Sequence, residues 1–206
     1  MYKQYWGKDR MTLTLNQRLS ELRNQLSSVR NLNKNHTAGD MKFFIFDYDP
    51  KDEIIVRQEI RKLVNANSEI VNFDLYEMMI EVILENGYFE TIKSMESQYE
   101  KSLLLQEVFQ PLLALEQSNN TILNTFSHSV EDDGNHIILI TGVGKSFPII
   151  RSHTILNNLQ SIFKNNPVVM VYPGKFSAKK GHLKLFDKLD DDNYYRAFPI
   201  IDRGEE

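Results

Sequence analysis

The stretch from His136 to Gly174, HIILITGVGKSFPIIRSHTILNNLQSIFKNNPVVMVYPG, decides the fold class. Its two apolar runs, residues 137–140 and 168–172, are typical of strands that are covered on both faces. Between these runs, apolar residues recur at spacings of one, three and four, as they do in a helix with one apolar stripe. A strand, a helix and a second strand in so short a stretch predict a βαβ unit, which implies a parallel sheet with right-handed crossovers.

A second strand–helix–strand pattern lies nearer the N-terminus. Residues 42–49, KFFIFDYD, predict a buried strand that ends at Pro50. A helix is expected over 54–64 and another strand over 69–73, while the run YYRAFPII predicts a further strand near the C-terminus. We therefore expect an α/β protein with three layers and a mainly parallel sheet of four to five strands. The expected strands lie near residues 42–47, 69–73, 136–141, 168–172 and 195–200.

Helical periodicity dominates the segment between the two units, and residues 74–126 predict a helical insertion. In it, Asp74 is expected to cap a first helix, with Glu77 as its capping-box partner and Asn86-Gly87 at its end. Further helices are expected over 90–108 and 112–126.

Three other segments complete the expected organisation. An amphipathic helix is predicted over 13–29, before the first strand. Residues 175–193 are expected to form a basic loop broken by glycine and then an acidic turn. The whole chain, 1–206, is interpreted as one domain in which residues 1–10 are flexible.

Composition narrows the class of protein. The 206 residues are 41% hydrophobic and 25% charged, as in ordinary soluble globular proteins. A net charge of −4 and a pI near 5.8 do not favour direct binding to nucleic acid. The absence of cysteine excludes disulfides, thiolate chemistry and cysteine zinc sites. The sequence contains no signal-peptide pattern and no apolar run close to the ~20 residues of a membrane span, so we expect a cytoplasmic protein without membrane contact.

The segment ILITGVGKS, residues 138–146, resembles a phosphate-binding loop. In such a loop, glycines expose backbone N–H groups to phosphate beside a lysine and a hydroxyl. The final GKS matches that motif, but the required first glycine would fall at Leu139, inside the predicted strand. Pro148 also stands where a following helix needs a backbone N–H. The favoured interpretation of Gly142–Ser146 is a tight turn from strand to helix, and a degenerate phosphate loop is the alternative.

The segment FFIFDYDP, which contains Asp47 and Asp49, resembles the nucleophile motif of haloacid-dehalogenase-type phosphatases. In that family one carboxylate attacks phosphorus and the next handles the proton. Thr141, Lys175 and the acidic run 190–192 would have to supply the remaining groups. The proline and lysine that follow the motif depart from the small and apolar residues of that family. A capping role for the two aspartates is therefore favoured, and a phosphohydrolase site is the alternative.

Histidine forms no recognisable metal-binding pattern. His153 follows Arg151 and Ser152, and no second histidine stands at the spacing of a metal ligand. We therefore expect neither a metal ion nor a cofactor.

An ordered set of short motifs runs through most of the chain: FDYDP, ITGVG, RSH followed by ILNNLQ, VVMVYPG, and LFDKLDDDNYYRAF. This set resembles the BrxB family, a component of bacterial BREX (bacteriophage exclusion) defence systems. The resemblance covers roughly residues 13–200, and RSH before ILNNLQ and YYRAF after an aspartate-rich turn are its most distinctive parts. It carries over no catalytic residues.

The resemblance implies membership in a machine of several proteins. BREX systems combine a site-specific adenine methyltransferase, a large ATPase and an alkaline-phosphatase-like protein called PglZ. Beside these proteins, a small, cysteine-free and non-basic chain is expected to be a non-catalytic connector or regulator. The expected partners are other BREX proteins, with PglZ first among them, and any association with DNA is expected to be indirect, through the complex.

A docking surface is expected at the carboxyl ends of the strands, where the loops of parallel sheets form a crevice. The residues expected there are Asp47, Tyr48 and Asp49 after the first strand, Phe147 and Arg151 after the third, and Tyr172 at the fourth. Tyrosine and arginine are enriched among the residues that dominate binding energy in interfaces. We expect this edge to dock PglZ. The competing interpretation is that its aromatic side chains only cover the core.

Overall fold

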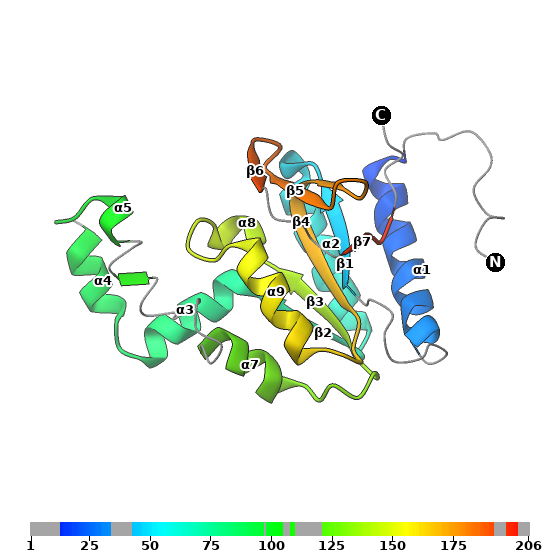
Figure 1. The fold of residues 1–206 in the computed structure, drawn as a ribbon, viewed down its shortest axis with the longest axis horizontal. Coiled ribbons are helices and arrows are strands. Elements are labelled where there is room, and N and C mark those ends of the chain that lie inside the picture. The colour runs from blue at the N-terminus through cyan, green and yellow to red at the C-terminus, as the bar shows by residue number, and fades with distance from the viewer. Residues whose placement is uncertain are drawn as a thin grey trace.

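The computed structural model describes residues 13–33, 43–96, 98–104, 108–109, 121–191 and 197–201. Its central sheet has helices on both faces, which confirms the predicted three-layer α/β class (Figure 1). Residues 1–10, predicted to be flexible, lie outside the described part of the chain. Within the described ranges, no helix is long and apolar enough to cross a membrane.

Five parallel strands form the main sheet. They are β1 (Phe43–Tyr48), β2 (Ile70–Asp74), β3 (Ile137–Thr141), β4 (Val168–Ser177) and β7 (Phe198–Pro199). Their order across the sheet is β2-β3-β4-β1-β7, and each neighbouring pair is parallel. All five lie at their predicted positions, although β4 continues farther than predicted.

The helices divide between the two faces of the sheet. One face carries α1 (Leu15–Asn33) and α2 (Glu53–Ala66), and the other carries α3 (Leu75–Glu85), α7 (Thr121–Ser129), α8 (Val143–Ser146) and α9 (Ser152–Ile162). Strands β3 and β4 lie between β2 and β1 in the sheet. The chain moves from β1 across to β2 in one direction, and it then returns in the opposite direction to β3 and on to β4. Crossovers of one hand that run in opposite directions must use opposite faces, which explains why α2 lies across the sheet from α3 and α9.

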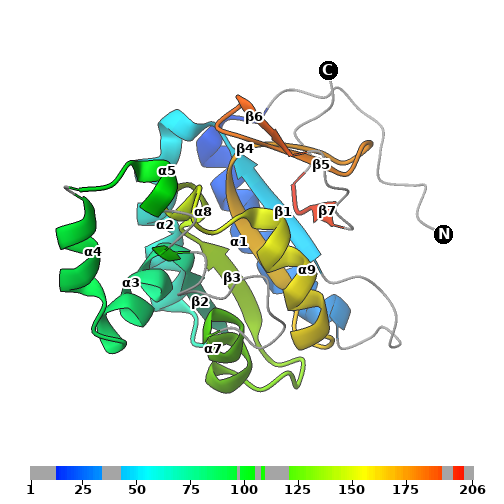
Figure 2. The same ribbon diagram turned by 60° about the vertical axis from the view of Figure 1, so that its left-hand side comes forward.

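The segment after Gly174, predicted as loop and turn, is instead an antiparallel extension of the sheet. The end of β4 pairs with β5 (His182–Leu185), which pairs with β6 (Leu189–Asp191). The prediction was wrong because lysines and aspartates dominate the composition here. The alternation in HLKL, which buries Leu183 and Leu185, is the sequence signal of this strand. This β5–β6 hairpin lies beyond the carboxyl end of β1 (Figures 1 and 2).

The predicted insertion begins with α3, which packs on the sheet, and its projecting continuation, residues 84–104, is what we call the arm. Helix α3 begins as predicted at Asp74, whose carboxylate accepts the backbone N–H groups of Tyr76 at 3.0 Å and Glu77 at 3.2 Å. It ends at Glu85 with Asn86 as its C-cap, and Gly87 follows with a φ of 70°. Beyond it, α4 (Phe89–Glu96) and α5 (Lys101–Leu104) stand away from the sheet in both views (Figures 1 and 2).

The predicted continuous helix over 90–108 is wrong, because α4 ends at Glu96 and α5 begins only at Lys101. Helix α4 buries none of its own residues. Short helices in water depend on the packing of one face, so without such packing nothing stabilises a longer helix here. Of the other predicted helix, 112–126, the structure describes the part within α7.

Replacing Gly174 with alanine is expected to destabilise the fold by roughly 3 kcal/mol or more. A Cβ at this position would stand 2.0 Å from the carbonyl oxygen of Lys184 in the neighbouring strand. Gly87→Ala is the matched control, because a Cβ there meets nothing within 4 Å and costs only the left-handed backbone strain of about 1 kcal/mol. Urea unfolding of both variants measures the difference, and equal losses would contradict the close approach of β4 and β5.

Candidate functional site

The strand pairing brings the predicted segments together at one edge of the sheet. Asp47 lies opposite Tyr172 in β1 and β4, and Asp74 lies opposite Thr141 in β2 and β3. A Cβ on Gly144, in the turn after β3, would stand 3.0 Å from the side chain of Pro173. The carboxyl ends of β1, β3 and β4 therefore converge, as predicted from their parallel direction.

Asp47 is buried at this edge, with only 4% of its surface exposed. One carboxylate oxygen accepts a bond from Arg18 of α1 at 2.9 Å, and the other accepts the backbone N–H of Phe176 at 3.0 Å. The Arg18 side chain is equally buried, with its guanidinium 5.1 Å from the centre of the Phe46 ring. Asp47 thus joins α1, β1 and the extension of β4, and the helix-capping role predicted for it is wrong, because Asp49 is the residue that caps the next helix.

The other groups of the phosphohydrolase interpretation have separate roles. Asp49 caps the short 3₁₀ helix Pro50–Asp52 by accepting the backbone N–H of Lys51, in agreement with the predicted capping role. Thr141 donates to the side chain of Asn72 at 3.1 Å. Asp190 pairs with Lys184 within the β5–β6 hairpin.

The two glycines of the GVGKS turn are required by close packing. A Cβ on Gly142 would stand 2.2 Å from Oδ1 of Asp74, and a Cβ on Gly144 would stand 2.9 Å from the ring of Phe186. Phe186 belongs to the turn of the β5–β6 hairpin, where its φ is 54°. The space that a phosphate would need above this turn is therefore taken by a carboxylate and an aromatic ring.

The lysine and the serine of the same turn also have internal partners. Lys145 forms an ion pair with Asp74 at 2.7 Å and lies 5.2 Å from the centre of the Tyr76 ring. Ser146 is fully buried and donates to the carbonyl of Val143 at 3.2 Å. These contacts support the interpretation as a tight turn from strand to helix.

The residues expected to dock a partner differ in accessibility. The side chains of Asp47, Tyr48 and Tyr172 are buried, so they do not form a surface. Burial, and then a hydrogen bond to the carboxylate of Glu53, raises the pKa of Tyr48, so its phenol stays protonated and donates. Arg151 is exposed. Three of the expected docking side chains therefore help to hold the core together.

The remaining two expected residues, Asp49 and Phe147, are half-buried. The Phe147 ring packs edge-on against Phe186, with 6.4 Å between the ring centres. Solvent therefore reaches three of the predicted docking residues, Asp49, Phe147 and Arg151.

A cavity of about 340 Å³ lies beside this edge, on the face covered by α2. It opens between the polar side of α2, with Arg57, Arg61 and Asn65, and the carboxyl ends of β2 and β3. Arg57 is paired with Glu53 at 2.9 Å, and Lys145 with Asp74, so positive and negative charges nearly balance here. Such a lining favours no strongly charged ligand.

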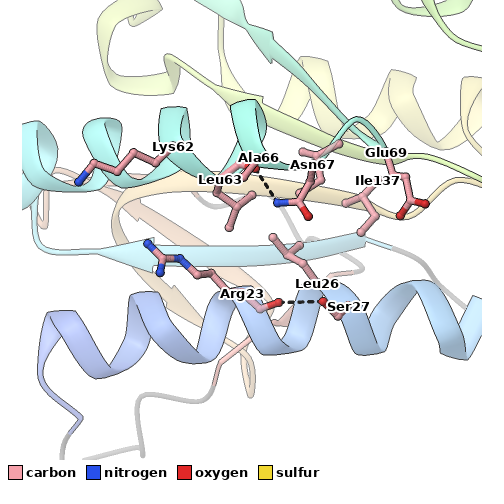
Figure 3. A pocket seen from close by; sticks show the side chains of 10 residues that line it. Arg23, Leu26, Ser27, Lys62, Leu63, Ala66, Asn67, Glu69 and Ile137 are labelled. Carbon is pink, nitrogen blue, oxygen red and sulfur yellow. Dashed lines mark hydrogen bonds between the residues drawn. The ribbon is translucent and has the colours of Figure 1, made fainter.

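A larger cavity of about 520 Å³ lies at the opposite end of the sheet, between α1 and α2 (Figure 3). Leu26 and Leu63 point toward one another across it, and Ile137 at the start of β3 forms part of its floor. Its cations, Arg23 and Lys62, both pair with Glu59 of α2. In the part of the chain that the structure describes, no three His, Cys, Asp or Glu side chains gather where a metal ion could be held.

The ion pair between Arg18 and Asp47 was not predicted from the sequence. Its signal is an arginine within the apolar stripe of α1, between Leu15 and Leu22. A charged residue on a core-facing stripe needs a buried partner of opposite charge, and Asp47 is the acid inside the first predicted strand.

Replacing Arg18 with methionine is expected to cost about 3–5 kcal/mol of stability, because it leaves a buried carboxylate without its cation. Arg57→Met is the control, since its pair with Glu53 is partly exposed and is expected to contribute less than about 1 kcal/mol. Denaturant unfolding of both variants measures the two losses. An Arg18→Met variant as stable as the control would show that α1 does not depend on this pair.

Comparison with known proteins supplies the family. The family model described as BREX protein BrxB matches residues 71–200, more than half of the chain. A BREX protein BrxB from Bacillus cereus (strain H3081.97) is 39% identical over 194 residues, which cover 92% of this chain and 98% of that relative. Another, from Escherichia coli O9:H4 (strain HS), is 25% identical over 190 residues, or 91% and 92%. No solved structure matches significantly. The chain therefore belongs to the BrxB family of BREX proteins.

Proposed function

We propose that the chain is a non-catalytic connector or regulatory subunit of a BREX anti-phage defence complex, acting through protein–protein contacts. Its BrxB family membership supports a place in a BREX system. One observation supports the non-catalytic part of this proposal. Two enzyme-like motifs contain the reactive groups Asp47, Lys145 and Ser146, and each of these groups bonds within the chain. Groups held in this way contribute to stability and are not free to bind a substrate.

PglZ is the expected direct partner, and the carboxyl edge of the sheet is the expected contact. At that edge, Arg151 is exposed and Phe147 is half-buried. A planar guanidinium suits recognition of a carboxylate on a protein surface. Any association with DNA follows through the complex, because the chain has a net charge of −4.

Co-purification of the tagged, full-length chain with the other BREX proteins of the same system tests this function. A stable complex that contains PglZ is the expected result. Arg151→Glu is expected to weaken that complex by roughly tenfold or more, because it reverses the charge at the contact. A wild-type chain that binds no BREX protein would overturn the proposed function.

Lys164→Glu is the matched control for that experiment. Lys164 is also an exposed basic residue, but it lies just before β4, at the amino end of the sheet. The control is expected to bind PglZ as the wild type does. Equal weakening by both variants would indicate a general charge effect and would contradict a contact at the carboxyl edge.

The purified chain is expected not to hydrolyse ATP or GTP in the presence of magnesium, because Lys145 is held by Asp74 and Ser146 by its own turn. Release of labelled phosphate measures this. Turnover above background that disappears in Lys145→Ala would favour the degenerate phosphate loop instead. Hydrolysis of a generic phosphate ester that disappears in a folded Asp47→Asn variant would likewise favour the phosphohydrolase site.

A further inference from the structure

The arm carries a group of large apolar side chains that the fold leaves in solvent. Tyr88, Phe89 and Tyr99 are 44%, 46% and 45% exposed, and Leu84 and Leu103 on either side of them are 54% and 41% exposed. Single exposed apolar residues are ordinary, but a cluster on one projecting element marks a surface that another molecule covers.

Helix α4 contributes little to the packing of the core. None of its residues is buried, and its contact with the nearest apolar cluster is through Ile92. Ile92 and Met95, three positions apart and both half-buried, form the side of α4 that turns toward that cluster. Tyr88, Phe89 and Tyr99 stay exposed, and exposed aromatic side chains are the kind that anchor in a groove of a partner protein.

The charge of the arm indicates the sign of the charge that its partner carries. The arm contains four glutamates and two lysines, all exposed, which leaves a net charge of −2. The net charge of the whole chain is −4, so half of it lies on this one segment. Glu85, Glu96 and Glu100 have no ion-pair partner among the described residues. Acidic charge that is available for pairing therefore lies on the same segment as the exposed aromatic side chains.

We infer that the arm is a second docking surface, which inserts its exposed side chains Tyr88, Phe89 and Tyr99 into an apolar groove of a protein whose rim is lined with lysine and arginine. The carboxyl edge and the arm would then contact partners independently, as a connector requires. The inference rests on the proposed function, because it assumes that the chain works within a complex. Nucleic acid and anionic membrane fit poorly, since both would be repelled by the glutamates. A second arm would be repelled in the same way.

Two variants of the arm test the apolar and the charged part separately. Phe89→Ala/Tyr99→Ala shortens two exposed aromatic side chains, and Glu96→Lys/Glu100→Lys reverses two unpaired charges. Each is expected to raise the Kd for one BREX protein by roughly tenfold or more, while the thermal midpoint of the free chain stays near that of the wild type. The charge variant is also expected to make binding less sensitive to salt.

Matched controls come from other parts of the surface. Ile54→Ala/Ile55→Ala removes an exposed apolar pair on α2, where the two side chains are 69% and 47% exposed. Glu131→Lys reverses one exposed charge between α7 and β3. Both controls are expected to bind as the wild type does. Calorimetric titration of each purified BREX protein of the system with the full-length chain supplies the Kd values.

The possible outcomes separate this inference from the proposed function. If the wild type binds a BREX protein and both arm variants bind it equally well, the arm is not a docking surface, but the connector role stands. If the controls weaken binding as much as the arm variants, the inference is also overturned. Arm variants that change only self-association would assign the surface to a second copy. If the wild type binds no BREX protein, both proposals fall.

Discussion

The buried ion pair between Arg18 and Asp47 is the constraint on which the rest of the fold depends. A carboxylate inside a sheet is tolerated only with a cation and hydrogen-bond donors around it. Arg18 supplies the cation, so α1 must cover the end of β1. The backbone N–H of Phe176 supplies a donor, so β4 must continue past the parallel sheet to reach it. One acid thereby positions the first helix and the strand that leads into the hairpin.

The hairpin in turn closes the edge where parallel sheets commonly bind ligands. Its turn holds Phe186 against Gly144, and the carboxylate of Asp74 lies against Gly142. The motif that resembles a phosphate loop is consequently filled by side chains of the protein itself. Glycines that would open a loop to phosphate here allow a ring and a carboxylate to approach the backbone.

The arm follows a different physical rule from the body. In the body, the strands and their flanking helices bury continuous apolar clusters on both faces of the sheet. In the arm, α4 leaves its aromatic neighbours and its glutamates exposed, so little of the folding free energy comes from it. The arm can therefore change its surface without loss of the fold, which is the property expected of a segment that contacts other proteins.

The sequence by itself determined the three-layer class, the five parallel strands and the cap of α3 at Asp74, because apolar runs and capping residues act over a few neighbouring positions. Tertiary structure decided the rest. The strand order and the antiparallel hairpin depend on pairing between segments that are not neighbours in the sequence. The partners of Asp47 and Lys145 are likewise far from them in the chain. A local pattern shows that Asp47 follows an apolar run, but only packing against α1 and β4 makes its carboxylate a buried group that joins three elements.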